Sequence, residues 1–323
     1  MTGLTEKTAR LALGALLAAW LCLAADGARA DAAADFEAGV TAAKSGRFDK
    51  AVELFTKALE AGTLSETDQA RVYNNRGAMY RKMGNPKAAI KDFSKAIDLR
   101  PRYFQALVNR GGTYGETGEF KKAEEDFENA IRLKPQEIST FLDRAKARAA
   151  NGRLGGAIND VTEVIRLQPQ NREAFMLRGG YYRSQGLYVR AIQDFTSAID
   201  LRASDPGAFS ERGLTRAYME EYPAALSDLN LAINLDSAKP EYYFQRGLIH
   251  GALGNHVSAF EDYSRAIQVK PDYVAALHAR GLAALGAGDK AQARKDALRA
   301  LELDPGNAGA TRLLKTLDSP PDR

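Results

Sequence analysis

The hydrophobic positions of this chain recur with a fixed period of 34 residues from Arg76 almost to its end. We number each period from 1 to 34, with Gly77 at place 8. Apolar, aromatic or small residues then recur at places 4, 8 and 11, and again at places 20, 24 and 27. Each set falls on one face of a helix. Each period therefore predicts two amphipathic helices separated by a short polar turn.

The two helices of a period combine small and large residues at fixed places. Place 20 is always alanine and place 27 is small, whereas place 24 is mostly large: Phe93, Phe127, Val161, Phe195, Leu229, Tyr263 and Ala297. Small residues let helices approach closely, and large ones fill the space between them. We expect a pure packing role, so that Phe127→Ala or Phe195→Ala costs roughly 3–5 kcal/mol.

Glycine and proline mark the turns. Glycine recurs at place 15, where it suits a helix C-cap, at Gly84, Gly118, Gly152, Gly186, Gly254 and Gly288. Proline at place 32 ends most second helices. Two periods lack it, and Pro206 and Pro240 stand instead at the first position of the next helix, which proline tolerates.

This pattern resembles the tetratricopeptide repeat, whose period is also 34 residues. Seven units share one register: 70–103, 104–137, 138–171, 172–205, 206–239, 240–273 and 274–307. A degenerate copy and linker precede them in 31–69, residues 308–317 predict a capping helix, and 318–323 a disordered tail. The resemblance implies an all-α fold, a right-handed α-solenoid superhelix of antiparallel helix pairs. In that family the first helix of each repeat lines a concave groove that binds partners.

A second regularity couples place 7 to place 23. All seven full units have arginine at the first and aspartate at the second: Arg76/Asp92, Arg110/Asp126, Arg144/Asp160, Arg178/Asp194, Arg212/Asp228, Arg246/Asp262 and Arg280/Asp296. In the degenerate copy Ala38 and Leu54 replace both charges together. We predict a partly buried structural ladder of arginine–carboxylate pairs. The alternative is a row of arginines that binds a partner.

Groove candidates follow from the family resemblance, at places 2, 5, 9 and 12 of the first helices. The early set is polar: Arg71, Asn74, Arg81, Gln105, Lys146 and Arg183. The late set is mostly apolar: Leu214, Phe244, Leu248, His278 and Leu282. We infer a groove graded from polar to apolar that anchors a peptide at its apolar end. The alternative is a solvated surface at one end and ordinary helix packing at the other.

The N-terminus reads as an export signal of a bacterial protein. Lys7 and Arg10 precede an apolar run over 11–25, and residues 28–30 form a small-x-small cleavage pattern. We expect cleavage after Ala30 and a periplasmic or secreted protein with no stable membrane insertion. An uncleaved anchor is the alternative. The single cysteine, Cys22, lies within this segment, so the mature chain would contain none.

Composition adds little to this picture. The formal net charge of +4 comes from 45 basic and 41 acidic residues, so we expect no nucleic-acid partner. No nucleophile elbow, phosphate loop or dinucleotide fingerprint occurs, and the three histidines, His250, His256 and His278, lack zinc spacing. We expect no enzyme activity, no cofactor and no metal.

These observations predict a non-enzymatic protein–protein interaction scaffold of the cell envelope. A peptide or protein segment would bind in the concave groove. The alternative is an accessory subunit that binds glycan or envelope polymer for a synthase or hydrolase. Some family members clamp a terminal carboxylate with lysine and asparagine at set places in successive repeats, and the sequence lacks that set. The sequence leaves the partner and the oligomeric state open.

Overall fold

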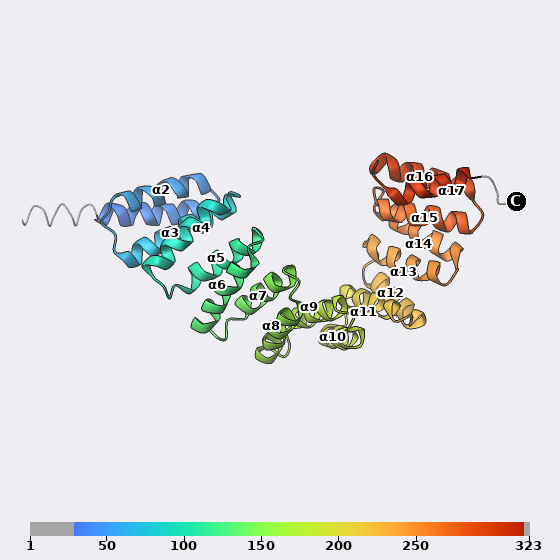
Figure 1. Ribbon diagram of the computed structural model, residues 1–323, viewed down its shortest axis with the longest axis horizontal. Coiled ribbons are helices and arrows are strands. Elements are labelled where there is room, and N and C mark those ends of the chain that lie inside the picture. Colours follow the sequence, from blue (N-terminus) through green and yellow to red (C-terminus); the bar gives the residue numbers. More distant parts are fainter. Residues whose placement is uncertain (1–28, 320–323) are drawn as a thin grey trace, which may run out of the picture. The chain divides into compact units, whose positions relative to one another are not determined.

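The computed structural model describes residues 29–319, which fold into helices and turns without a strand (Figure 1). The predicted export signal lies outside this range except for Arg29 and Ala30, which are helical, as residues 31–44 are, and exposed. Residues 320–323 of the predicted tail also lie outside it. Within residues 29–319, no helix is long and apolar enough to cross a membrane.

Contacts divide the chain into two compact units, with the boundary between Glu163 and Val164. After the helix over residues 29–44, unit 1 contains α2 Phe48–Glu60, α3 Glu66–Lys82, α4 Pro86–Leu99, α5 Phe104–Glu116, α6 Phe120–Leu133 and α7 Ile138–Ala150. The boundary falls within α8 Leu154–Leu167. Unit 2 contains α9 Arg172–Ser184, α10 Tyr188–Leu201, α11 Pro206–Tyr218, α12 Tyr222–Leu235, α13 Pro240–Ala252, α14 His256–Val269, α15 Val274–Gly286, α16 Lys290–Leu303 and α17 Ala308–Asp318.

Each unit is a series of helical hairpins stacked side by side (Figure 1). Helices consecutive along the chain pack on one another, and first helices of successive repeats also touch, as α3 and α5 do in unit 1 and α13 and α15 in unit 2. Because a single hairpin cannot cover its apolar face, the neighbouring repeat supplies the missing surface.

The two helices of a hairpin pack together where the residue at place 24 of the second helix contacts the residue at place 8 of the first. A Cβ added to Gly77 would lie 2.9 Å from the Phe93 ring, and one added to Gly179 would lie 2.7 Å from the Phe195 ring. Both rings are fully buried. Glycine is needed at place 8 because the ring packs directly on the backbone of the first helix.

Two repeats alter this contact. In residues 138–171, Ala145 replaces the glycine and the smaller Val161 replaces the ring, and both are fully buried. In residues 274–307, place 24 is Ala297, and a Cβ on Gly281 would instead meet Leu313 of α17 at 2.9 Å. The last helix therefore fills the space that a large residue fills elsewhere.

The turn within each hairpin needs left-handed backbone. Place 15 has positive φ in every full repeat: glycine in six of them, such as Gly84 at 73°, and Glu220 at 61° in the fifth. Within residues 29–319, Glu220 is the only residue other than glycine with positive φ, a conformation that costs an L-residue roughly 1–2 kcal/mol.

Candidate functional site

The arginine–aspartate ladder has one geometry throughout. In each full repeat the guanidinium donates from Nε and Nη2 to the two carboxylate oxygens, at 2.7 and 2.9 Å for Arg76 and Asp92 and at 2.8 and 2.8 Å for Arg178 and Asp194. The pairs in the other repeats match them: Arg110/Asp126, Arg144/Asp160, Arg212/Asp228, Arg246/Asp262 and Arg280/Asp296. All seven aspartates are buried. These bidentate pairs join the two helices of one repeat.

The pair at the end of the stack has an additional contact. Arg280 binds Asp296 at 2.8 and 2.6 Å, and its side chain is 17% exposed while that of Asp296 is 2% exposed, so this pair is partly buried like the others. Gln292, one turn earlier on α16, donates a further hydrogen bond to its carboxylate at 2.9 Å, and α17 packs against α16 and α15. The last helix thus closes this end of the stack, so that Asp296 is a buried internal acceptor that no partner in solution can reach.

The ladder also joins neighbouring repeats through an acceptor that sequence reasoning missed. The remaining Nη1 of Arg76 donates to Thr56 at 2.9 Å, and that of Arg280 donates to Ser264 at 3.2 Å. The acceptors share place 25, and the others are Ser94, Thr196 and Asn230. The recurrence of small polar residues at place 25 was the available signal. The hydrogen bond to Asp126 raises the pKa of Arg110 in spite of desolvation.

In two repeats a second arginine binds the same aspartate. Place 11 is tyrosine in three repeats, but it is Arg148 and Arg216 in the third and fifth. Arg148 donates to Asp160 at 2.8 Å, and Arg216 donates to Asp228 at 2.8 Å. Arg148 also binds the buried Glu124 at 3.1 Å. All these charges are neutralised within the protein, which makes the ladder a structural feature and not a docking row.

The first-helix face of unit 1 is tied together by polar side chains. Asn74 is buried, and its carbonyl accepts from Asn109 of the next repeat at 3.0 Å. Asn109 in turn accepts from the exposed Gln105 at 3.1 Å. Asn74 was predicted to face a bound peptide, but the next repeat covers it, so it holds two repeats together.

Two basic groove candidates of unit 1, Arg81 and Arg71, form ion pairs within the protein. Arg81 forms a bidentate pair with Glu116 of the next repeat, with Nη2 2.6 Å from the carboxylate. Its guanidinium lies against Gly112, where a Cβ would be 3.2 Å away. Arg71 pairs with Asp68 at 3.3 Å and covers the ring of Phe36.

Lys146 is exposed and lies 4.0 Å from Asp143. Burial raises the pKa of Asp143 in spite of the nearby Lys146 and Arg81. The charges on this face of unit 1 are therefore largely balanced.

Unit 2 exposes leucines on the face formed by its first helices. Leu214, Leu248 and Leu282 occupy place 9 in three successive repeats, and we call them the leucine row. Leu248 is 45% exposed and Leu282 is 48% exposed, whereas Leu214 is half-buried. Leu248 and Leu282 therefore each leave nearly half of their surface uncovered by the protein.

Two other late candidates are half-buried. The Phe244 ring has its centroid 5.7 Å from that of Tyr263 and 5.2 Å from that of Tyr273, both in its own repeat. His278 lies against α17, where a Cβ on Gly309 would be 2.7 Å from its ring. Desolvation, with Arg312 nearby, lowers the pKa of His278. Both side chains therefore pack on neighbouring groups and keep part of their surface exposed.

A depression of about 610 Å³ on α9 lies at the same face of unit 2. Met176, Leu177 and Gly180 are among its lining, and a Cβ on Gly180 would meet nothing within 4 Å. Arg183, predicted as a groove residue, lines it and pairs with Glu211 of the next repeat at 2.5 Å. We call this depression the α9 pocket.

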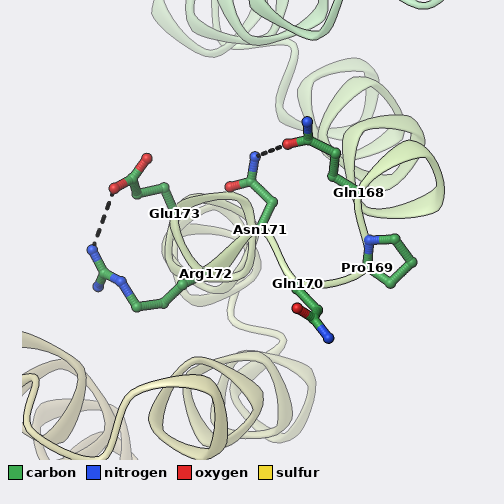
Figure 2. A pocket seen from close by; sticks show the side chains of 6 residues that line it. All are labelled: Gln168, Pro169, Gln170, Asn171, Arg172 and Glu173. Carbon is green, nitrogen blue, oxygen red and sulfur yellow. Dashed lines mark hydrogen bonds and ion pairs between the residues drawn. The ribbon is translucent and has the colours of Figure 1, made fainter.

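A separate depression of about 590 Å³ lies at the turn before α9 (Figure 2). In it Asn171 donates to Gln168 at 3.0 Å, and Arg172 pairs with Glu173 at 3.5 Å. Arg172 also pairs with Asp205. The charges of this turn are thus neutralised locally.

The histidines and acidic residues of the described part of the chain are the remaining groups with chemistry of their own. Over residues 29–319, no three histidine, cysteine or acidic side chains are grouped so that they could hold a metal ion. His250 lies with its Nε2 3.9 Å from Asp262, a carboxylate already bound by Arg246.

The fold and the ladder define an all-α repeat protein. Models of the tetratricopeptide repeat match residues 70–103, 104–137, 142–207, 240–273 and 274–307, which together exceed half of the chain. The chain belongs to the tetratricopeptide repeat family. Proteins of this family are generally non-catalytic scaffolds for protein–protein interaction. No curated protein matches the chain.

Two solved structures with TM-scores of at least 0.60 agree on the fold, and a third is similar in sequence. A tetratricopeptide repeat protein from Parabacteroides merdae is 18% identical and aligns over 78% of this chain and 100% of its own, with a TM-score of 0.62. The C-terminal part of one from Cytophaga hutchinsonii is 21% identical over 74% of this chain and 98% of its own, with a TM-score of 0.60. A MamA protein is 28% identical over 53% of this chain and 93% of its own, with a TM-score of 0.47.

Proposed function

We propose that this protein is a non-enzymatic adaptor of the bacterial cell envelope that holds an apolar segment of a partner protein on the first-helix face of unit 2. The observation that carries the proposal is the exposure of Leu248 and Leu282 at one place of successive repeats. Covering the exposed half of each side chain would contribute about 1 kcal/mol. The α9 pocket offers a second apolar contact in the same unit.

Export is part of this proposal. The basic residues, apolar run and small-x-small pattern of the first 30 residues support secretion into the periplasm or beyond. A test compares the N-terminal residue and the cell fraction of the chain expressed in a Gram-negative host. An unprocessed cytoplasmic protein would refute this part alone.

The binding test uses leucines of matched exposure. Leu248→Ser with Leu282→Ser removes the exposed row, whereas Leu231→Ser with Leu298→Ser removes two leucines that are 43% and 49% exposed on second helices. We expect a partner cross-linked from an envelope extract to bind the row variant on the order of tenfold more weakly and the control variant normally. Equal losses in the two variants, or no loss, would refute the face.

A glycan-binding accessory role is favoured by one observation. Tyr218 is 59% exposed and stacks on Tyr188, with ring centroids 5.6 Å apart and planes at 5°. An exposed tyrosine face can stack on a sugar ring. Binding of purified envelope glycan that is lost in Tyr218→Ala, without any protein partner, would select this role over the first.

A further inference from the structure

Unit 1 has a pocket at a turn that the adaptor function does not use. It lies where α4 gives way to α5, beside the end of α6, and has a volume of about 500 Å³. We call it the cationic turn pocket, and it is lined by Arg100, Arg102, Tyr103, Phe104, Gln105, Leu133 and Lys134. Three of these side chains are cationic, and none of the lining residues, all of which the structure describes, is acidic.

The three cations lack the ion pairs that neutralise most arginines of this chain. Over residues 29–319, neither Arg100, Arg102 nor Lys134 has a carboxylate within ion-pair distance. Arg71, whose charge also opposes the rise in the pKa of Tyr103, is by contrast paired with Asp68. Like charges gathered in one depression repel one another, and a bound anion would relieve that repulsion.

Aromatic rings hold two of the cations at the pocket. The Arg100 guanidinium carbon lies 5.0 Å from the centroid of the Tyr103 ring, and Lys134 Nζ lies 4.4 Å from that of Phe104. A cation held over a ring face keeps its N–H donors available, because the ring accepts no ordinary hydrogen bond. Burial raises the pKa of Tyr103 in spite of Arg100 and Arg71, so its hydroxyl keeps its proton as a further donor.

The equivalent turn two repeats further on shows that the fold does not need these cations. Gln168 and Gln170 take the register positions of Arg100 and Arg102, and Arg172 takes that of Phe104 (Figure 2). There the one cation is paired with Glu173 and Asp205. A similar depression forms with glutamine at both arginine positions, so the arginines of the cationic turn pocket serve something other than the turn.

We propose that the cationic turn pocket binds a phosphate-type anion. Two guanidinium groups can present paired N–H donors to phosphate oxygens, and the ammonium group of Lys134 adds a point charge. The chemistry is that of a phosphate or diphosphate group, either on a soluble compound or on a lipid headgroup. The proposal is independent of the leucine row, which lies in the other unit.

The test measures binding of inorganic pyrophosphate to the purified chain by calorimetry. Arg100→Gln with Arg102→Gln copies Gln168 and Gln170 of the equivalent turn, so the variant should fold. Lys87→Gln with Lys91→Gln removes the same charge from exposed lysines of α4. We expect the arginine variant to bind pyrophosphate about tenfold or more weakly and the lysine variant to bind it as the unaltered chain does.

A second arm distinguishes the two sources of phosphate. Vesicles of phosphatidylglycerol that bind the chain but not the arginine variant, with phosphatidylcholine vesicles inert, would assign a lipid headgroup. Pyrophosphate binding without vesicle binding would assign a soluble compound. Equal pyrophosphate binding by all three proteins, or none at millimolar concentration, would overturn the proposal. So would tighter binding of an oligoglutamate peptide, because the pocket would then serve an acidic protein segment.

Discussion

The first-helix faces of the two units differ in polarity although their residues occupy the same places of the repeat. Place 9 is Ala78, Gly112 and Lys146 in unit 1, but Leu214, Leu248 and Leu282 in the last three repeats of unit 2. In unit 1 hydrogen bonds such as Asn109 to Asn74 and the pair of Arg81 with Glu116 occupy the polar groups. In unit 2 apolar side chains stay half exposed. The repeats share one kind of interior but differ in the residues that this face exposes, and the exposed leucines of unit 2 are the basis of the proposed partner contact.

The ladder is common to both units, so removing a ladder aspartate should destabilise the two units by similar amounts. Asp160→Ala and Asp228→Ala each leave two guanidinium groups in the protein without their carboxylate. We expect each variant to lose about 3–5 kcal/mol of the free energy of unfolding, measured by urea denaturation with hydrogen exchange in the affected unit. Asp194→Ala is the control with a single bidentate ladder arginine and should lose less. A loss below about 1 kcal/mol in both units would contradict a stabilising ladder.

The polar contacts between first helices should weigh more in unit 1. Asn74→Ala removes the acceptor of Asn109 and the donor to Asn75, so we expect a loss of about 1–2 kcal/mol. Ser210→Ala removes one hydrogen bond, to Gln245 at the same pair of places in unit 2, and should cost about 1 kcal/mol or less. Thermal or urea denaturation of the two variants measures this difference. Equal losses would show that the polar face of unit 1 is no more tightly held.

The leucine row should contribute little to folding. Leu248→Ser should change the free energy of unfolding by less than about 0.5 kcal/mol, because the side chain is half exposed. Leu277→Ala, whose side chain is 3% exposed, should cost about 2–5 kcal/mol. Urea denaturation of both variants provides the comparison. A large loss in Leu248→Ser would make the row part of the core and remove its claim as a docking surface.

The smallest expected effect is a pH dependence of stability that comes from His278, at place 5 of the last repeat. It concerns unit 2 alone, since place 5 of the full repeats of unit 1 carries no histidine. Because desolvation and Arg312 lower the folded-state pKa of His278, the unfolded chain binds the proton more readily. Stability from this group is complete above about pH 6.5, the ordinary histidine value, and declines as the pH falls below it. His278→Gln should flatten the decline in melting temperature between about pH 7.5 and 5.5. An unchanged slope would contradict a desolvated His278.

The sequence predicted the family and the helical hairpins because a strict period repeats the same packing problem. A large residue 16 positions after a glycine, as in Gly179 and Phe195, can be satisfied only when two helices fold back on each other. Arg178 and Asp194 have the same separation, and the same fold-back brings them together. The turn glycines at place 15 were also readable, since left-handed backbone favours glycine.

The exposure of the predicted groove residues was harder to predict from the sequence, because it depends on which side chains of the next repeat pack against each first helix. Asn74, Phe244 and His278 share place 5, but their surroundings differ. Asn74 is covered by the following repeat, His278 lies against α17, and Phe244 is half-buried against rings of its own repeat. The second arginines, Arg148 and Arg216, were missed because place 11 read as an aromatic core position. Only the neighbouring carboxylate, supplied by the folded hairpin, explains a charge there.

The extra contact at the last ladder pair was equally unreadable. The pairing of Arg280 with Asp296 follows from a separation within one period, but the further hydrogen bond from Gln292 and the packing of the closing helix α17 do not. A pattern shared by seven repeats cannot show what differs at the end of the stack.

By itself, the sequence determined the local hairpin and its internal ladder, since both depend on separations within one period. The tertiary structure alone decided which side chains stay exposed: Leu248, Leu282 and the cationic turn pocket are open, whereas Asn74 is closed. The physical reason is that burial at a repeat's surface is set by contacts from the adjacent repeat, which the pattern within a single period does not contain.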